Sequence, residues 1–390
     1  MPVNPRLHPG DEWHPERSGG QSSSWYETPA FRPGSFHFFL YPGCELTGLS
    51  TCYKIKYDLP MPSDHPSLHK AIELLLSRGN LPILFWLKKD ILEVPVDRDF
   101  KNLSKLGARL RILAAQREDG SWPKDRANAP NLENKPEFLI ETLKNAYKLH
   151  DYGCRLDNDE FRNSIHYLFS SQTAEGDFRA TATNEYSPGF HALTLEILCR
   201  YGLDKDARIQ KGFHWILKTR QKDGGWAIPC RTISKDQVER RYQRLSGSKK
   251  SPFKPDKSKP FSHFITGMVL RALAESTTWK GSKECRKAGE LVLSRFFKED
   301  QYEDRRAASH WEELTYPFWT TNIVSSLDSL SKIGFPADQP MISQSLDWLL
   351  SKQNHLGYWE SDAKKASLED HLWITFAVLR VFRRFGLLHI

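Results

Sequence analysis

The sequence predicts an all-α protein built as a closed array of similar helical hairpins. Four copies of one pattern, a glutamine followed shortly by glycine and an aromatic residue, begin at Gln116, Gln172, Gln221 and Gln353. Apolar residues at helical spacing precede each copy, and no stretch alternates as a strand would. A unit that recurs about every 50 residues indicates a repeat architecture. The 390 residues therefore favour one large repeat unit over several ordinary domains.

The chain divides into an arm and a helical domain. Residues 1–47 are rich in Pro, Gly and aromatic residues without a sustained period, which predicts an extended N-terminal arm. Residues 48–390 are expected to form a single domain with a basic flexible insertion at about 232–260. Its helices are expected at 65–77, 82–92, 102–116, 136–151, 159–172, 188–201, 205–221, 260–276, 283–297, 317–333, 341–353 and 368–385.

These helices are of two kinds that alternate along the chain. One kind begins after Pro or an acidic turn and ends in an aromatic–Gly connection, as at Gly202, Gly334 and Gly386, where glycine suits a helix C-cap. The other follows a short link containing Asp and ends at the glutamine. Alternation predicts antiparallel pairs, with the first kind inside a ring and the second outside. The helices at 65–77 and 368–385 lack neighbours of the complementary kind in sequence, so we expect them to pair and close the ring.

Charge and hydropathy exclude several classes of protein. The net charge is +8, and residues 232–260 hold nine Lys/Arg against three Asp/Glu, which leaves the rest nearly neutral. We therefore expect no nucleic-acid partner. Mean hydropathy is −0.58, and the longest apolar run, Leu81–Leu87, is far too short to cross a membrane. Six scattered cysteines and the lack of an N-terminal apolar segment favour a reduced, cytoplasmic setting.

The repeated motif has a local structural logic. The glutamine side chain at an outer-helix end can hydrogen-bond the backbone of the connecting turn and of the next helix. Glycine permits the positive φ that the turn needs, and the aromatic ring covers the glutamine and packs on the neighbouring repeat. The motif is therefore expected to fasten the ring rather than to catalyse.

The third copy carries a resemblance to a known superfamily. Residues Lys211–Trp226 resemble the QW repeat of squalene and oxidosqualene cyclases and of protein prenyltransferase β subunits, and the other copies match less fully. The resemblance covers roughly residues 81–385. It implies an α/α toroid of about six helical hairpins around a central cavity. It also implies that an isoprenoid or another apolar small molecule binds there and is cyclised or transferred by acid catalysis.

The catalytic motifs of the superfamily are missing or altered. Class II cyclases use an Asp-x-Asp-Asp acid, which this sequence lacks; the nearest runs are Asp97–Asp99 and Asp157–Glu160, the latter placed to cap a helix. The prenyltransferases bind zinc through an Asp, a Cys and a His. In this sequence Glu313 is at the position of the Asp and Thr315 at that of the Cys, and only His371 is the same residue type as the family's ligand. Because a poor ligand replaces the thiolate, neither a metal nor another cofactor is expected.

Polar residues recur at the starts of inner helices. His191, His263, His371, Glu313 and Asp370 are expected near one mouth of the ring, as candidates for proton transfer. The other interpretation is that they are helix-start residues bonded to local backbone. Aromatic residues near the same ends are candidates for substrate binding and for stabilising a carbocation, or for the core; they are Trp311, Phe318, Trp319, Trp373 and Tyr186.

Two further functions stay open. One is a non-catalytic repeat protein whose basic segment Arg240–Lys259 or outer face binds a protein partner. The other is a metal-dependent enzyme on the same ring with histidine ligands. The sequence also leaves open contact with a membrane surface.

Overall fold

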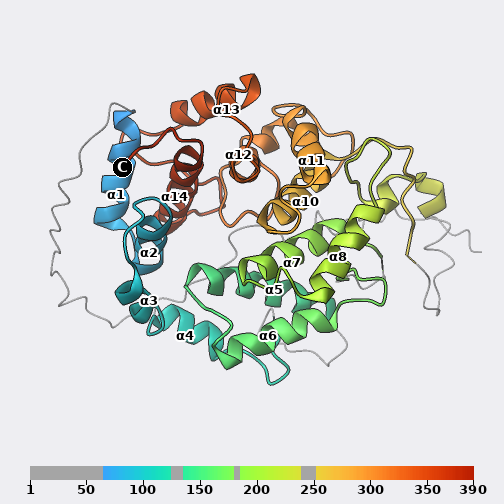
Figure 1. The fold of residues 1–390 in the computed structure, drawn as a ribbon, viewed down its shortest axis with the longest axis horizontal. Helices are drawn as coiled ribbons and strands as arrows, with labels where there is room; N and C mark the ends of the chain where they lie inside the picture. The colour runs from blue at the N-terminus through green and yellow to red at the C-terminus, as the bar shows by residue number, and fades with distance from the viewer. Residues whose placement is uncertain (1–64, 124–134, 180–184, 239–251) are drawn as a thin grey trace, which may run out of the picture. The chain divides into compact units, whose positions relative to one another are not determined.

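The computed structural model describes residues 65–123, 135–179, 185–238 and 252–390, all of which lie in one compact unit, residues 33–390 (Figure 1). The predicted arm at 1–47 lies outside the described residues. Within them the structure is helical, with no strand beyond a single bridge between Gln172 and Phe178. This confirms the predicted all-α class.

The helices follow the predicted order. They are α1 (Pro66–Arg78), α2 (Leu81–Asp90), α3 (Asp97–Leu103), α4 (Gly107–Leu113), α5 (Lys135–Asp151), α6 (Asp159–Ser170), α7 (Pro188–Arg200), α8 (Ala207–Lys218), α10 (His263–Glu275), α11 (Lys283–Leu293), α12 (Ile323–Lys332), α13 (Pro340–Ser351) and α14 (Leu368–Arg384). Short 3-10 turns occur at Pro229–Arg231 and Ala308–Trp311. Two elements differ most from expectation.

The first difference lies at 102–116, where α3 and α4 replace one helix because Leu106 is extended. The second lies at 317–333, where α12 starts only at Ile323. Asn322 forms a capping box with Ser325 and so fixes that start. The expected C-cap glycines are confirmed, since Gly202, Gly334 and Gly386 have φ of 80°, 76° and 72°.

Burial separates the helices into the two expected kinds. In α7 every residue from Pro188 to Cys199 is buried, and α10 is buried from His263 to Ala274. By contrast α8 buries one face only. The buried helices contact one another in turn, α5 with α7, α7 with α10, α10 with α12, α12 with α14, and α14 with α2. These are the inner helices, and the others flank them.

The ring closes between the first and last described helices. Helix α1 packs on α14, beside which it lies in Figure 1 (blue next to dark red). The Gln353 amide donates to the Ser67 carbonyl at 2.8 Å, and Lys70 Nζ donates to the His355 carbonyl at 2.5 Å. The predicted pairing is confirmed, and the contacts describe the α/α-toroid class that the sequence predicts.

The repeated motif fastens successive repeats. The amides of Gln116, Gln172 and Gln353 donate to the carbonyls of Gly120, Gly176 and Gly357, which all have positive φ. Gln172 and Gln353 donate in addition to the first turn of the next outer helix, at Arg208 and Ser67. The indole N–H groups of Trp122, Trp226 and Trp359 donate to carbonyls ten residues earlier. The motif therefore joins a helix end, its turn and the neighbouring repeat.

The basic insertion is described only at its two ends. Its most basic part, residues 239–251, lies outside the described residues, so its flexibility stays a prediction. At the far end, the Gln221 amide donates to the carbonyls of Asp256 and Lys259, and the Phe253 N–H donates to Glu185. This repeat thus uses its glutamine to hold the returning end of the insertion.

Among the helices that the structure describes, none is both long enough and apolar enough to cross a membrane.

Candidate functional site

His191 is buried between two repeats. Its Nδ1 accepts a hydrogen bond from the Phe178 N–H at 3.0 Å, so the ring hydrogen sits on Nε2, which donates to the Gly212 carbonyl at 3.0 Å. Burial lowers the pKa of His191 to about 4, although the bond to Gly212 opposes this. His191 is therefore neutral near pH 7, with both nitrogens occupied by backbone.

His263 and Glu313 lie in two separate polar groups. The His263 ring stacks on Trp311, with 4.5 Å between centroids, and its Nδ1 is 3.4 Å from Asp300. Burial lowers the pKa of His263 to about 4 against the pull of Asp300. Glu313 pairs with Arg305 and lies 2.5 Å from His310. Burial would raise the pKa of Glu313, but His310 and Arg305 offset this and lower it.

Asp370 and His371 open α14. Asp370 Oδ2 accepts from the Ser367 N–H and hydroxyl in a capping box. His371 Nδ1 accepts from the Ser361 N–H at 2.8 Å, and its ring stacks on Tyr358. Within the described residues no hydrogen bond or ion pair joins any two of the five predicted catalytic residues. That part of the chain also holds no group of three His, Cys, Asp or Glu placed to bind a metal ion.

The predicted aromatic residues divide among three places. Tyr186 contacts Trp215 and donates its hydroxyl to Glu175, while Trp311 donates its indole N–H to the Lys298 carbonyl. Phe318, Trp319 and Trp373 instead gather around two tyrosines of the ring interior. Tyr316 contacts Phe318 edge-on and stacks on Trp373, with a 7° angle between ring planes. Tyr147 contacts Trp319 edge-on at 5.0 Å.

Tyr316 also contacts a carboxylic acid that sequence reasoning missed. The Tyr316 hydroxyl donates to Asp151 Oδ1 at 3.0 Å, which joins the segment before α12 to the end of α5. The Trp86 indole N–H donates to the Asp151 carbonyl at 2.8 Å, and the Trp86 ring stacks on His150. We call Trp86, His150, Asp151, Tyr316 and Trp373 the interior cluster. It draws on α2, α5, α14 and the segment before α12.

Lys148 extends the interior cluster toward the start of α14. Burial lowers its pKa, while the charges of Glu369, Asp370 and Asp151 raise it. These carboxylates therefore lie close enough to act on the ammonium group. The charge of Asp370, one of the predicted residues, therefore acts on a lysine one turn before Asp151.

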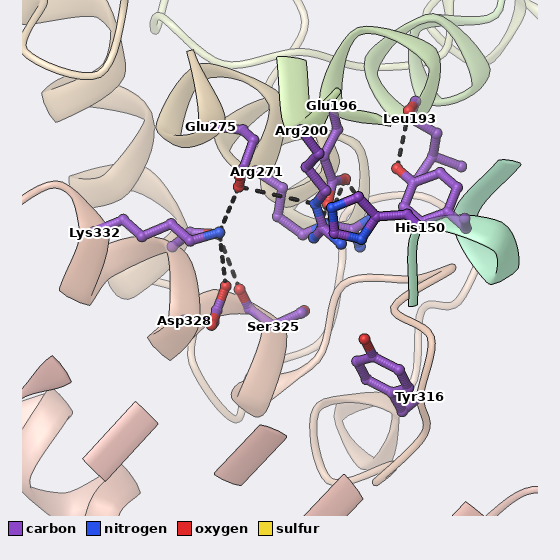
Figure 2. Close-up of polar contacts among 12 residues, drawn as sticks. His150, Leu193, Glu196, Arg200, Arg271, Glu275, Tyr316, Ser325, Asp328 and Lys332 are labelled. Carbon is purple, nitrogen blue, oxygen red and sulfur yellow. Dashed lines mark hydrogen bonds and ion pairs between the residues drawn. The ribbon is translucent and has the colours of Figure 1, made fainter. Parts of the chain in front are cut away.

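A continuous chain of ion pairs adjoins the interior cluster at the C-terminal ends of the inner helices. We call it the ion-pair belt; its members are Asp90, Glu196, Arg200, Arg271, Glu275, Asp328, Lys332, Arg380 and Arg384. Glu196 contacts Arg200 at 2.6 Å and Arg271 at 2.7 Å. Lys332 lies between Glu275, at 2.5 Å, and Asp328, at 3.1 Å (Figure 2).

Asp328 is the most crowded member of the ion-pair belt. It pairs with Lys332, Arg380 and Arg384, and its side chain is 4% exposed. Burial would raise the pKa of Asp328, but the three cations more than offset it and hold the pKa well below the usual range. Burial would likewise raise the pKa of Glu275, but the charges of Lys332 and Arg200 lower it to about 2. Both groups are carboxylates at neutral pH.

The sequence carried a signal for the ion-pair belt. Four inner helices that are otherwise buried each hold two charged residues four positions apart, at 196/200, 271/275, 328/332 and 380/384. That spacing puts both on one helix face, and a charged pair on an apolar helix demands a buried partner. Asp151 carried a weaker signal, because it ends a helix where the macrodipole opposes negative charge.

With this geometry in place, one known protein matches the sequence directly. A squalene–hopene cyclase from Bradyrhizobium diazoefficiens is 27% identical over 172 residues, which are 43% of this chain. Over these residues the chain is similar to a squalene cyclase, and the match supports a relation to the squalene cyclase-like superfamily. The matched residues span 23% of that cyclase, and no family model matches the chain.

Two solved structures of low similarity accompany this match. One is a variant of the type II terpene cyclase MstE from Scytonema in complex with geranylgeranyl dihydroxybenzoate, 16% identical, with a TM-score of 0.42 over 73% of this chain and 72% of that one. The other is a protein from Actinoplanes, 13% identical, with a TM-score of 0.42 over 82% of this chain and 98% of that one. The likeness of this chain to squalene cyclases therefore rests on the sequence match.

Proposed function

We propose that this chain is a terpenoid cyclase-like protein that binds an isoprenoid or another apolar small molecule inside its ring of helices. The observation that supports this most is a set of aromatic pairs between separate elements, Tyr147 of α5 with Trp319 and Tyr316 with Trp373 of α14. Flat apolar rings beside a few fixed polar groups are typical of small-molecule sites. The same rings would stabilise a carbocation.

Acid catalysis is the finer part of the proposal. Of the predicted residues, Glu313 and Asp370 accept hydrogen bonds that suit a carboxylate, and His191 has both nitrogens occupied. A carboxylate accepts a proton but has none to donate.

Binding is tested by titrating the full chain with linear terpenes and isoprenyl diphosphates while tryptophan fluorescence is recorded, with products followed by mass spectrometry. We expect one class to bind, and Trp319→Leu to weaken it about fivefold, since an aromatic contact contributes about 1 kcal/mol. Trp279→Leu is the matched control, because Trp279 contacts Phe213 and His214 of α8 instead.

Two results would redirect the proposal. If no compound in the panel binds, the ring is not a small-molecule site, and the non-catalytic repeat protein with a protein partner becomes the better reading. If a compound binds and is recovered unchanged, the chain is a binding protein on a cyclase-like fold. Cytoplasmic location stays a prediction that fractionation checks.

A further inference from the structure

A basic surface lies around the turn that follows α8, on the outside of the ring. Exposed lysines come together there from the end of α8 and its turn, from the returning end of the insertion, and from α11. We call this surface the basic face; its members are Lys218, Lys222, Lys257, Lys259 and Lys287.

Contacts between the three segments hold these lysines beside one another. The Lys222 N–H donates to the Lys257 carbonyl at 2.8 Å, and Lys257 Nζ donates to the Lys218 carbonyl at 2.6 Å. The side chain of Lys287 packs on Gly224 of the same turn, where a Cβ would lie 3.1 Å from the lysine Cγ. The basic face is therefore one patch that the fold assembles.

The three nearby acids already have other partners. Both oxygens of Asp223 accept backbone N–H groups, and Asp256 accepts the N–H and hydroxyl of Ser258. Glu284 lies 3.9 Å from Arg220. Within the described residues no lysine of the basic face forms an ion pair; the lysines that do are Lys88, Lys144, Lys235 and Lys332. With Arg220 counted, six cations stand against three carboxylates.

This accumulation of charge differs from the rest of the molecule. Members of the ion-pair belt have partners of opposite charge, and the exposed Arg286 of α11 lies 3.8 Å from Glu290. Like charges repel one another, so unpaired lysines around one turn cost stability. Departures from such local rules are concentrated at functional sites. The basic face therefore indicates an anionic partner outside the chain.

We propose that the basic face binds the surface of a bilayer that contains anionic phospholipids. Every member is a lysine, whose compact, hydrated charge suits a diffuse negative surface, whereas the arginine fork suits single phosphate or carboxylate groups. The exposed large apolar residues of the described chain, Leu110, Leu356 and Leu368, lie outside the basic face, so the contact is electrostatic. A third argument rests on the proposed function, since an apolar ligand dissolves in bilayers.

The experiment sediments the full chain with vesicles and adds no terpene, so its result does not depend on the proposed function. We expect binding to vesicles that contain phosphatidylserine and phosphatidylcholine, and none to vesicles of phosphatidylcholine alone. Raising the salt from about 0.1 M to about 1 M shortens the screening length from about 10 Å to about 3 Å. This increase should release the protein from the vesicles.

Lys222→Gln combined with Lys287→Gln tests the basic face itself. Both side chains are exposed and take no part in the ion pairs described above, so the double variant should keep its fold. We expect the partition coefficient to fall about 30-fold, which corresponds to about 1 kcal/mol for each lysine at an anionic surface. Lys101→Gln combined with Lys105→Gln is the matched control, because it removes the same charge from exposed positions at α3.

Each other outcome contradicts a stated part of the proposal. Equal binding by the two double variants would show that the basic face is not the contact. Salt-resistant binding to phosphatidylcholine vesicles would show an apolar contact instead. Absence of vesicle binding would overturn the proposal, and capture of the protein by immobilised poly-glutamate would then identify an acidic protein segment as the partner. None of these results changes the terpene titration, so the two proposals fail separately.

Discussion

At the scale of the residue, the charged interior is the feature that needs a physical account. Burying an ion costs several kcal/mol, and the ion-pair belt offsets this by giving every member an opposite charge at hydrogen-bond or ion-pair distance. Arg271 shows the principle, since its guanidinium binds Glu196 and also donates to the Thr320 carbonyl. Loss of a single partner therefore leaves an uncompensated charge.

Asp328→Asn tests this reasoning. The change leaves Lys332, Arg380 and Arg384 without their shared carboxylate. We expect the free energy of unfolding to fall by about 3–5 kcal/mol, as measured by urea denaturation at pH 7. The control is Asp347→Asn, whose exposed side chain should leave stability within about 0.5 kcal/mol of the wild type. A loss no larger than in the control would show that the belt contributes no stability.

The same carboxylates predict how stability depends on pH. The folded-state pKa of Glu275 is about 2 and that of Asp328 lies well below its usual value, so the unfolded chain takes up these protons first as pH falls. Their stabilisation is complete above about pH 4.5 and is lost progressively toward pH 2. Melting temperatures measured between pH 7 and pH 3 should fall steeply below pH 4.5, and less steeply for Glu275→Gln.

At the scale of the element, the repeated glutamine motif does more than end a helix. Gln116 donates to the carbonyl of its own turn, whereas Gln353 donates both to its turn and to the first turn of α1. The backbone N–H of Trp359 donates to the Thr375 hydroxyl of α14. The last copy therefore holds an outer helix, an inner helix and the start of the ring together.

Gln353→Ala and Gln116→Ala form a matched pair. Each hydrogen bond contributes about 1 kcal/mol to the free energy of unfolding. We therefore expect Gln353→Ala to lower that free energy by about 2 kcal/mol and Gln116→Ala by about 1 kcal/mol. Hydrogen exchange should further show faster opening of α1, residues 66–78, in Gln353→Ala alone, because only that change removes the contact to Ser67. Equal exchange of α1 in both variants would contradict the assigned role.

At the scale of the whole molecule, sequence reasoning predicted the fold far better than the interior. The helical period of apolar residues, the C-cap glycines and the four glutamines were enough to predict that inner and outer helices alternate and that the ring closes. Each of these is a pattern within a short stretch of sequence. The pairing of Asp151 with Tyr316 joins residues 165 positions apart, and that of Arg271 with Glu196 joins residues 75 apart. Which of these distant residues pair depends on how the helices pack, and a pattern within one short stretch of sequence does not contain that information. Of the residues predicted at the starts of inner helices, Asp370 bonds within its own turn, whereas His191 bonds to Phe178 and Gly212 of other segments.

The closure of the ring also bears on how the chain is made. The Gln353 amide and the Ser67 carbonyl that it binds are separated by 286 residues. Helix α1 is synthesised long before α14, so its apolar face of Leu68, Ile72 and Leu75 stays without that partner until residues 368–384 have been made. Contacts of such long range slow folding and leave hydrophobic surface exposed meanwhile. We therefore expect chaperones to bind the nascent chain until α14 emerges from the ribosome.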